Sequence, residues 1–226
     1  MPTNQGHHDD PIEQALEAAL AGRMLLTHPF YRRWEAGELS LDELGRYSSQ
    51  YRHFEANLPR LLEDLSGQLK GAGLVEEGAI VGQNLHDELG NPAPHLELFD
   101  QFMSAVGGVR AEPTAATGAL TSTYADLVAE GVVMGLAGLA AYETQASAIA
   151  GTKADGLRLR YGIDEEGTSF WDVHAAMEVE HGDWILDGLA SLGARPDHVE
   201  AAARRGADAW WGFLDERELE ASIGIG

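Results

Sequence analysis

The chain of 226 residues is 44% hydrophobic and 23% charged, a composition that supports one folded domain and excludes a wholly disordered protein. Asp and Glu outnumber Lys and Arg by 37 to 15, and the formal net charge of −22 disfavours nucleic acid and anionic membrane surfaces as partners. The sequence contains no cysteine, which excludes disulfide bonds, thiolate metal sites and thiol nucleophiles.

The sequence shows no sign of a membrane or secretion segment. No apolar run approaches the roughly 20 residues that cross a bilayer. Residues 1–10 are polar and acidic and lack the basic and apolar regions of a signal peptide. We therefore expect a cytoplasmic protein.

Helical patterns follow one another along the whole chain. Residues 1–9 are expected to form a disordered tail, and residues 10–226 one helical domain. Asp10 followed by Pro11 is typical of a helix start, and Ser40 with Glu43 forms a capping box before a long apolar pattern that runs to Leu65. The further expected segments are 28–34, 75–89, 95–106, 113–130, 132–161, 166–192 and 196–223. No stretch alternates with a period of two, so we predict an all-α, single-domain bundle of about 7–9 helices.

The most informative segment for chemistry is residues 170–181. At about 100° per residue, His174, Glu178 and His181 fall within an arc of roughly 60° on one helix face. Imidazole and carboxylate groups suit iron, manganese or zinc, and facing helices commonly hold such sites. The alternative interpretation is a solvated polar stripe.

Two other segments carry candidate metal ligands. Glu143 lies in an apolar stretch without a neighbouring basic residue, so it either needs a cation or hydrogen-bond partner or is exposed. Glu88 and His95 flank Gly90 and two prolines, which predicts the end of one helix and the start of another. His86 and Asp87 are rival candidates that the spacing alone does not separate.

Four blocks of the sequence resemble the CADD-type folate-related proteins, a branch of the haem-oxygenase-like dimetal oxidases. The resemblance spans roughly Leu16 to Asp183, with the blocks in the same order as in the family. The blocks are residues 28–34, 47–51, 84–102, and 142–161 followed by His174-x3-Glu178-x2-His181. The resemblance implies a helical bundle without haem and the metal-ligand set Glu88, His95, Glu143, His174, Glu178 and His181. Glu178 departs from the family's usual aspartate, and Phe170 stands where close relatives carry a tyrosine near the metal.

The resemblance also implies an unusual reaction, the formation of p-aminobenzoate for folate from a tyrosine of the protein itself. Its functional positions match Tyr31, Tyr47 and Tyr142, with Lys153 as the amino donor. Lys153 and Tyr142 are 11 residues apart, so they point the same way along a helix. The alternatives are core packing for Tyr31 and Tyr47 and a solvated surface position for Lys153. Lys153 is one of two lysines beside 13 arginines, and unlike arginine its amine can lose a proton.

We thus expect an O2-activating dimetal oxygenase that uses two iron ions, or iron and manganese, with O2 and an external reductant as co-substrates and no external organic substrate. One alternative keeps the metals and oxidises a free amino acid or a fatty acid. Another is a non-catalytic helical interaction protein. A thiamine-pathway hydrolase of the same fold is disfavoured because the chain has no cysteine nucleophile. Trp210 and Trp211 are expected to pack the last helix onto the bundle, the alternative being a homodimer contact.

Overall fold

The computed structural model describes residues 10–90 and 93–223; in the helical stretches 177–183 and 221–223 the description covers the backbone alone. The described residues form nine α-helices and one 3₁₀ turn and contain no strand, which confirms the all-α prediction. None of these helices is both long and apolar enough to cross a membrane. The predicted tail, residues 1–9, lies outside the described residues.

The helix boundaries follow the sequence signals closely. Asp10 accepts a hydrogen bond from the Ile12 amide, at 2.7 Å, and caps the first helix. Ser40 and Glu43 form the predicted capping box. The helices are α1 (Pro11–Leu20), α2 (Pro29–Ala36), α3 (Leu41–Gly71), α4 (Val75–Gly90), α5 (His95–Ala105), α6 (Ala115–Glu130), α7 (Val132–Tyr161), α8 (Glu165–Ser191) and α9 (Pro196–Ile223), with the 3₁₀ turn η1 (Leu25–Thr27) before α2.

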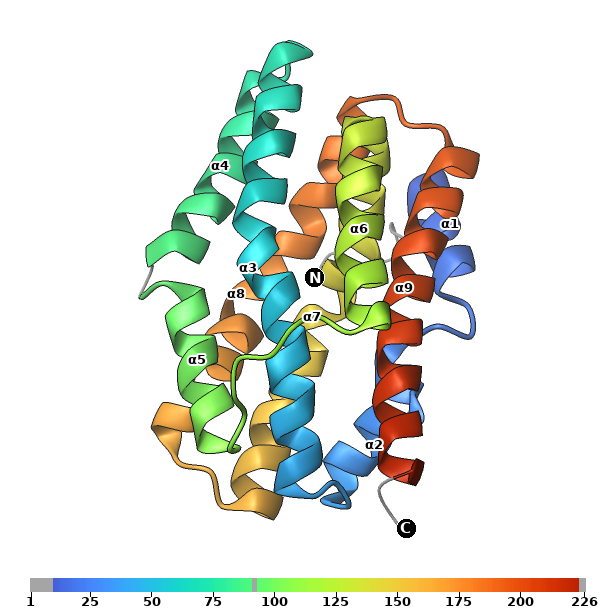
Figure 1. The fold of residues 1–226 in the computed structure, drawn as a ribbon. Coiled ribbons are helices and arrows are strands. Elements are labelled where there is room, and N and C mark those ends of the chain that lie inside the picture. Colours follow the sequence, from blue (N-terminus) through green and yellow to red (C-terminus); the bar gives the residue numbers. More distant parts are fainter. Residues whose placement is uncertain (1–9, 91–92, 224–226) are drawn as a thin grey trace, which may run out of the picture.

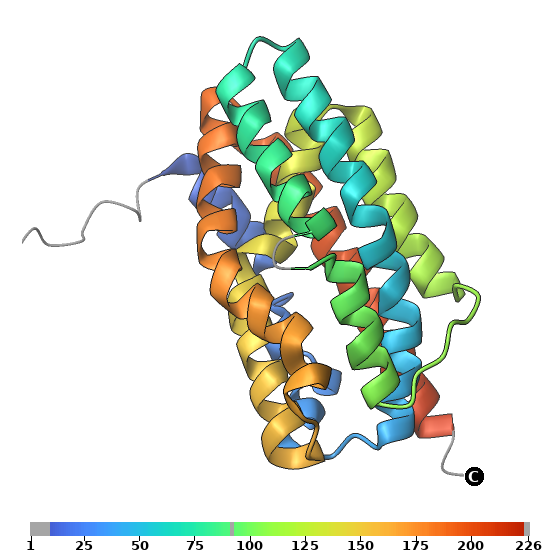
Figure 2. The same ribbon diagram turned by 90° about the vertical axis from the view of Figure 1, so that its left-hand side faces the viewer.

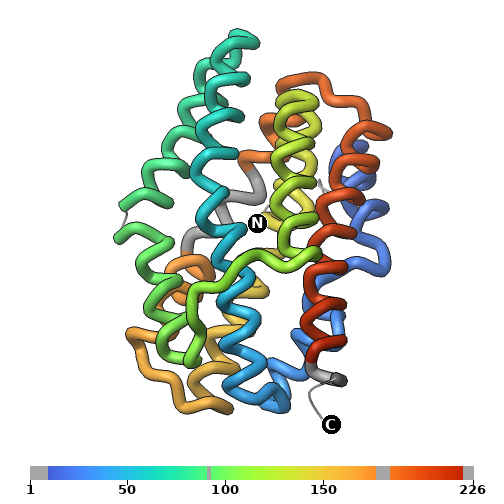
Figure 3. The backbone as a smooth tube through the Cα atoms, in the orientation of Figure 1, coloured from blue at the N-terminus to red at the C-terminus, as the bar shows by residue number. Residues whose placement is uncertain are grey.

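The bundle is arranged around two long helices, α3 and α7. Helices α4 and α5 lie one after the other along α3 (Figure 1), so the break between them comes at mid-length of the bundle. Helix α7 packs chiefly against α8 and α9, and α7 and α8 lie side by side in the turned view (Figure 2). The tube drawing shows the short reversals that join α3 to α4 and α7 to α8 (Figure 3).

Helix α7 is central because its sequence is apolar or small on most sides. All seven residues from Leu136 to Tyr142 are buried. A Cβ at Gly156 would lie 2.9 Å from Cδ1 of Trp34, so only glycine lets α2 pack so closely on α7. The left-handed Gly162 (φ 68°) then ends α7. This helix therefore brings the interior side chains of α2, α3 and α8 around itself.

The two tryptophans of α9 have different environments. Trp210 is fully buried. Its ring centre lies 4.8 Å from that of Tyr142, on which it stacks, and 4.7 Å from that of Phe54, which it meets edge-on. Trp211 is half-buried and lies against the His28 ring at 4.7 Å. Trp210 thus packs the last helix onto the bundle, as predicted.

Candidate metal centre and lysine cage

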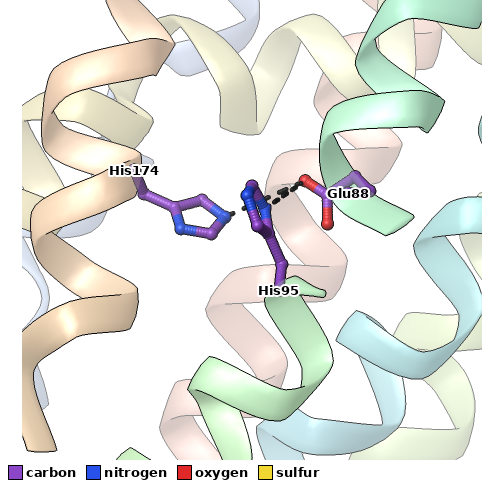
Figure 4. A group of neighbouring side chains, drawn as sticks. All are labelled: Glu88, His95 and His174. Atoms are coloured by element: carbon purple, nitrogen blue, oxygen red, sulfur yellow. Dashed lines mark ion pairs between the residues drawn. The ribbon is translucent and has the colours of Figure 1, made fainter. Parts of the chain in front are cut away.

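Three side chains with metal-ligand chemistry converge at the break between α4 and α5. Glu88 lies two residues before the end of α4, His95 is the first residue of α5, and His174 lies on α8 (Figure 4). One ligand atom from each lies within 4.8 Å of the other two. Nδ1 of His95 lies 3.1 Å from Oε1 of Glu88, and Nε2 of His174 lies 3.9 Å from the same oxygen. We call Glu88, His95 and His174 the metal group.

Helix α8 holds the His174 ring in a suitable orientation for a ligand. Its Nδ1 lies 2.8 Å from the Phe170 carbonyl oxygen, which can only accept, so this nitrogen carries the proton and donates. In the neutral ring, Nε2, which faces Glu88, therefore keeps its lone pair for a metal ion. A ligating histidine is commonly fixed by such a hydrogen bond on its other nitrogen.

The metal group fits a transition-metal ion by its donor set. Two imidazoles and one carboxylate make up the ligand combination of many non-haem iron oxygenases, in which coordination positions stay open for oxygen. His95 and His174 are buried and the Glu88 side chain is only 10% exposed, so the donor atoms are largely shielded from water. The alternative interpretation, a solvated polar stripe, is thus wrong for His174.

The rival and remaining candidates can be placed in part. His86 is exposed, and Asp87 accepts a hydrogen bond from Gln83 at 3.1 Å, so the structure favours Glu88 over both for the metal group. Glu143 is half-buried on α7. The side chains of Glu178 and His181 lie outside the described residues, so their roles as ligands stay predictions.

A second cluster surrounds the amine of Lys153, which is 1% exposed. Its Nζ donates a hydrogen bond to the Tyr47 hydroxyl at 2.8 Å. Five aromatic rings lie around this nitrogen, and we call them the lysine cage: Trp171 at 4.0 Å from Nζ to the ring centre, Tyr31 at 4.5 Å, Tyr51 at 5.0 Å, Tyr47 at 5.3 Å and Trp34 at 5.7 Å. Lys153 is therefore not the solvated surface lysine that was its alternative interpretation.

Two hydroxyl pairs extend the lysine cage. Tyr31 and Tyr47 are joined by a hydrogen bond of 2.9 Å, and Tyr51 and Tyr142 by one of 2.6 Å. Burial raises the pKa of Tyr47 and Tyr51 well above the usual tyrosine value, and neighbouring acidic groups raise it further. These phenols therefore stay protonated at neutral pH. Because Tyr51 borders Lys153 and bonds Tyr142, it connects two of the predicted positions.

Glu55 is an interior carboxylate that the sequence analysis missed. It is 4% exposed and lies one turn after Tyr51 on α3. Burial raises the pKa of Glu55 well above its usual value, and the charges of Glu88 and Glu143 raise it further, while Tyr51 and Lys153 act in the opposite direction. A cation bound near these carboxyl groups would act against this shift.

Three residues of the interior were thus not singled out from sequence: Tyr51, Glu55 and Trp171. A signal for two of them, Tyr51 and Glu55, was present. Tyr47, Tyr51 and Glu55 repeat every four residues and so share one face of α3. Phe170, by contrast, was noted for its departure, and its ring packs on the His174 ring at 4.0 Å between centres.

A comparison of the sequence with protein families agrees with this geometry. A family model described as an iron-containing redox enzyme matches residues 45–211. The chain belongs to this family. Membership in a family of iron-containing redox enzymes, together with the metal group, supports a metal cofactor for the enzyme.

Individual relatives extend the match over most of the enzyme. A 4-aminobenzoate synthase of Nitrosomonas europaea is 32% identical over 220 residues, which cover 90% of this chain and 89% of that protein. A CADD-like protein of unknown function from Nostoc punctiforme has the same fold, with 21% identity, a TM-score of 0.75 and coverage of 93% and 96% of the two chains. A domain from Shewanella denitrificans with a haem-oxygenase-like fold is 16% identical, with a TM-score of 0.75 and coverage of 95% and 93%. The resemblance and the fold predicted from sequence are confirmed.

Proposed function

We propose that the enzyme forms p-aminobenzoate from one of its own tyrosines, with Lys153 as the amino donor. The observation that carries this proposal is the hydrogen bond from the buried Lys153 amine to the Tyr47 hydroxyl, with the Tyr31 ring at the same nitrogen. It occurs in a chain that is 32% identical to a 4-aminobenzoate synthase. A nitrogen donor and two candidate ring donors are thus in contact in a site that requires no bound organic substrate.

A metal cofactor fits the proposal through the residues that would hold it. Glu88, His95 and His174 would hold one ion, and Glu143, Glu178 and His181 are proposed for a second. When bound, iron, or iron with manganese, supplies O2 activation with electrons from an external reductant. The alignment of the reacting groups and the exclusion of water come from the protein's own residues.

The protein's own residues would align the reacting groups and exclude water. The Tyr31 and Tyr47 hydroxyls bond each other at 2.9 Å, and the Tyr31 ring centre lies 4.5 Å from Nζ of Lys153. Both tyrosines and Lys153 are at most 2% exposed, so competing reactions with water are suppressed. Holding both partners at contact distance replaces a bimolecular encounter and thereby lowers the barrier.

The test is product formation without an organic substrate. Purified enzyme loaded with Fe²⁺ or with Fe²⁺ and Mn²⁺ is exposed to O2 and a reductant, and p-aminobenzoate is measured by mass spectrometry. Lys153→Arg should abolish the product while iron binding persists, because arginine keeps the charge but has no transferable amine. Lys70→Arg is the matched control, since Lys70 is exposed and is the only other lysine of the sequence.

Peptide mapping of the spent chain should find the altered tyrosine at Tyr31 or Tyr47. Undiminished product from Lys153→Arg would contradict the role of the lysine. Product that appears only after a free amino acid or a fatty acid is added would contradict self-consumption and favour an external substrate.

A further inference from the structure

The lysine cage has the composition of a binding site for an ammonium group. All five ring centres lie within 6 Å of Nζ of Lys153, the range over which an aromatic face attracts a cation. The nearest ring, at 4.0 Å, is that of Trp171, the side chain with the strongest attraction of this kind. The Tyr47 hydroxyl supplies a hydrogen-bond acceptor at 2.8 Å. Aromatic cages of this kind recognise methylated and other ammonium groups in proteins.

The rings of the lysine cage have supports other than the lysine side chain. Its rings come from α2, α3 and α8, whereas Lys153 comes from α7. Trp34 donates to the backbone oxygen of residue 153 at 3.4 Å, a contact that any side chain at this position preserves. Tyr51 stacks on Phe99 at 5.2 Å, and the ring of Trp171 meets that of Phe102 at the same distance. The rings should therefore stay in place when the amine is removed.

A neutral molecule of the same size would gain the apolar contacts of the lysine cage but not the full interaction of a cation with the ring faces.

We propose that the lysine cage is a binding site for small primary ammonium ions, which enter from solution when the side chain at position 153 is shortened so that it no longer fills the cage. Lys153→Ala removes Cγ, Cδ, Cε and Nζ, so n-propylammonium is the missing fragment. Buried cavities made by such truncations take up small ligands that match their shape and polarity. This binding does not depend on the proposed function.

The experiment is a titration of metal-free Lys153→Ala with n-propylammonium chloride, followed by calorimetry and thermal unfolding at constant ionic strength. We expect binding at least 10-fold tighter than that of 1-propanol, which has the same length without the charge. Trp171→Phe in the Lys153→Ala background keeps a weaker aromatic face and should reduce the ammonium affinity roughly threefold or more.

Two controls locate the binding. Lys153→Met fills the lysine cage with an uncharged chain and should bind no n-propylammonium. Lys70→Ala keeps the cage filled by Lys153 and should likewise show none. Equal affinity of Lys153→Ala for the ammonium ion and the alcohol would overturn the proposal. Binding of n-propylammonium to either control as tight as to Lys153→Ala would also overturn it, because the binding would then belong to the acidic surface.

The proposal can still be tested if Lys153→Ala does not fold. If Lys153→Ala is unfolded alone, refolding with n-propylammonium but not with 1-propanol supports the proposal. Lys153→Val leaves a smaller gap, for which ethylammonium against ethanol is the matched pair. Variants that respond alike to the ammonium ion and the alcohol in both pairs would overturn the proposal. Because metal, O2 and reductant are absent, these results are independent of whether the enzyme makes p-aminobenzoate.

Discussion

The metal group and the lysine cage lie in the same bundle but are built differently. Glu88 and His95 come from the facing ends of α4 and α5, and the Glu88 side chain retains some exposure. The rings of the lysine cage come from within helices and are at most 2% exposed. The metal group gathers donor atoms that could hold a metal ion, whereas the lysine cage is completed by a side chain of the protein. Ion binding should therefore stabilise the first region, and packing the second.

The largest expected effect is the loss of iron affinity when the metal group alone is altered. His174→Ala removes one of its two imidazoles, and we expect iron affinity to fall by more than about 100-fold, since even a residue behind a ligand contributes 10- to 100-fold. Product formation should disappear with it. Metal analysis after dialysis and near-ultraviolet circular dichroism are the measurements, and the dichroism of the lysine cage should change little.

His86→Ala is the matched control for this variant. His86 is exposed and lies two residues before Glu88, so its loss should leave the iron content at the wild-type level. Full iron content in His174→Ala, or its loss in His86→Ala, would contradict the assignment of the metal group.

The second prediction compares two hydroxyls of the lysine cage. Tyr47→Phe takes a hydrogen-bond partner from both Lys153 and Tyr31, and the free energy of unfolding should fall by about 1–3 kcal/mol. Tyr31→Phe keeps the bond from Lys153 to Tyr47 and should cost about 1 kcal/mol. Urea unfolding of both variants, without metal, measures the difference. A larger loss for Tyr31→Phe would show that the Lys153–Tyr47 bond does not dominate the region.

The sequence predicted most of the fold because its signals are local. Capping at Asp10 and Ser40 and the glycines between the apolar patterns each act within a few residues. The 3₁₀ turn Leu25–Thr27 was missed, and its first amide is held by the Gln145 side chain at 2.9 Å, 120 residues away. Such a contact leaves no trace in local spacing.

The candidate site could be predicted where a resemblance or an unusual residue drew attention. Glu88 could not be separated from Asp87 by spacing, because the way α4 packs against α8 decides which carboxylate faces His174. Glu55 and Trp171 looked like an ordinary polar and an ordinary apolar position of their helices. Their place beside Lys153 depends on how α3, α7 and α8 pack, which the order of residues within each helix does not state.

The third prediction separates stability from function in both regions. Ser40→Ala removes the cap of α3 at the end of the helix, where the Glu43 amide bonds the serine oxygen at 3.2 Å. The free energy of unfolding should fall by about 1 kcal/mol and the melting temperature by roughly 2–4 °C. Iron content and product per chain should stay unchanged. Ser122→Ala, on an exposed part of α6, is the control and should shift the free energy by less than about 0.5 kcal/mol.

If Ser40→Ala lost iron or product in proportion to its stability, the effects of Tyr47→Phe and His174→Ala could also be losses of folded protein. The assignment of either region would then require iron content and product to be measured per folded chain and not per total protein.

The smallest expected effect concerns α2, the helix that carries Tyr31 and Trp34 into the lysine cage. His28 is fully buried and caps this helix: its Nδ1 accepts from the Phe30 amide at 3.1 Å, so its Nε2 carries the proton toward Asp215. Burial lowers the pKa of His28 below its ordinary value of 6.5, although the hydrogen bond and charge of Asp215 oppose the shift.

The sign of the resulting pH dependence follows from proton counting. Between the lowered pKa of His28 in the folded state and 6.5, the unfolded chain binds a proton that the folded chain does not. The free energy of unfolding should thus decrease as the pH falls below about 6.5 and level off once the folded-state histidine is also protonated. His28→Asn keeps an oxygen acceptor for the Phe30 amide but does not titrate, so its free energy of unfolding should fall less over this range. Urea unfolding of both proteins at pH 7.5, 6.5 and 5.5 measures this difference. The contributions of the other titrating groups cancel because both proteins contain them. Parallel pH profiles would show that His28 is protonated alike in the folded and unfolded states, and that it contributes nothing to the pH dependence of the free energy of unfolding.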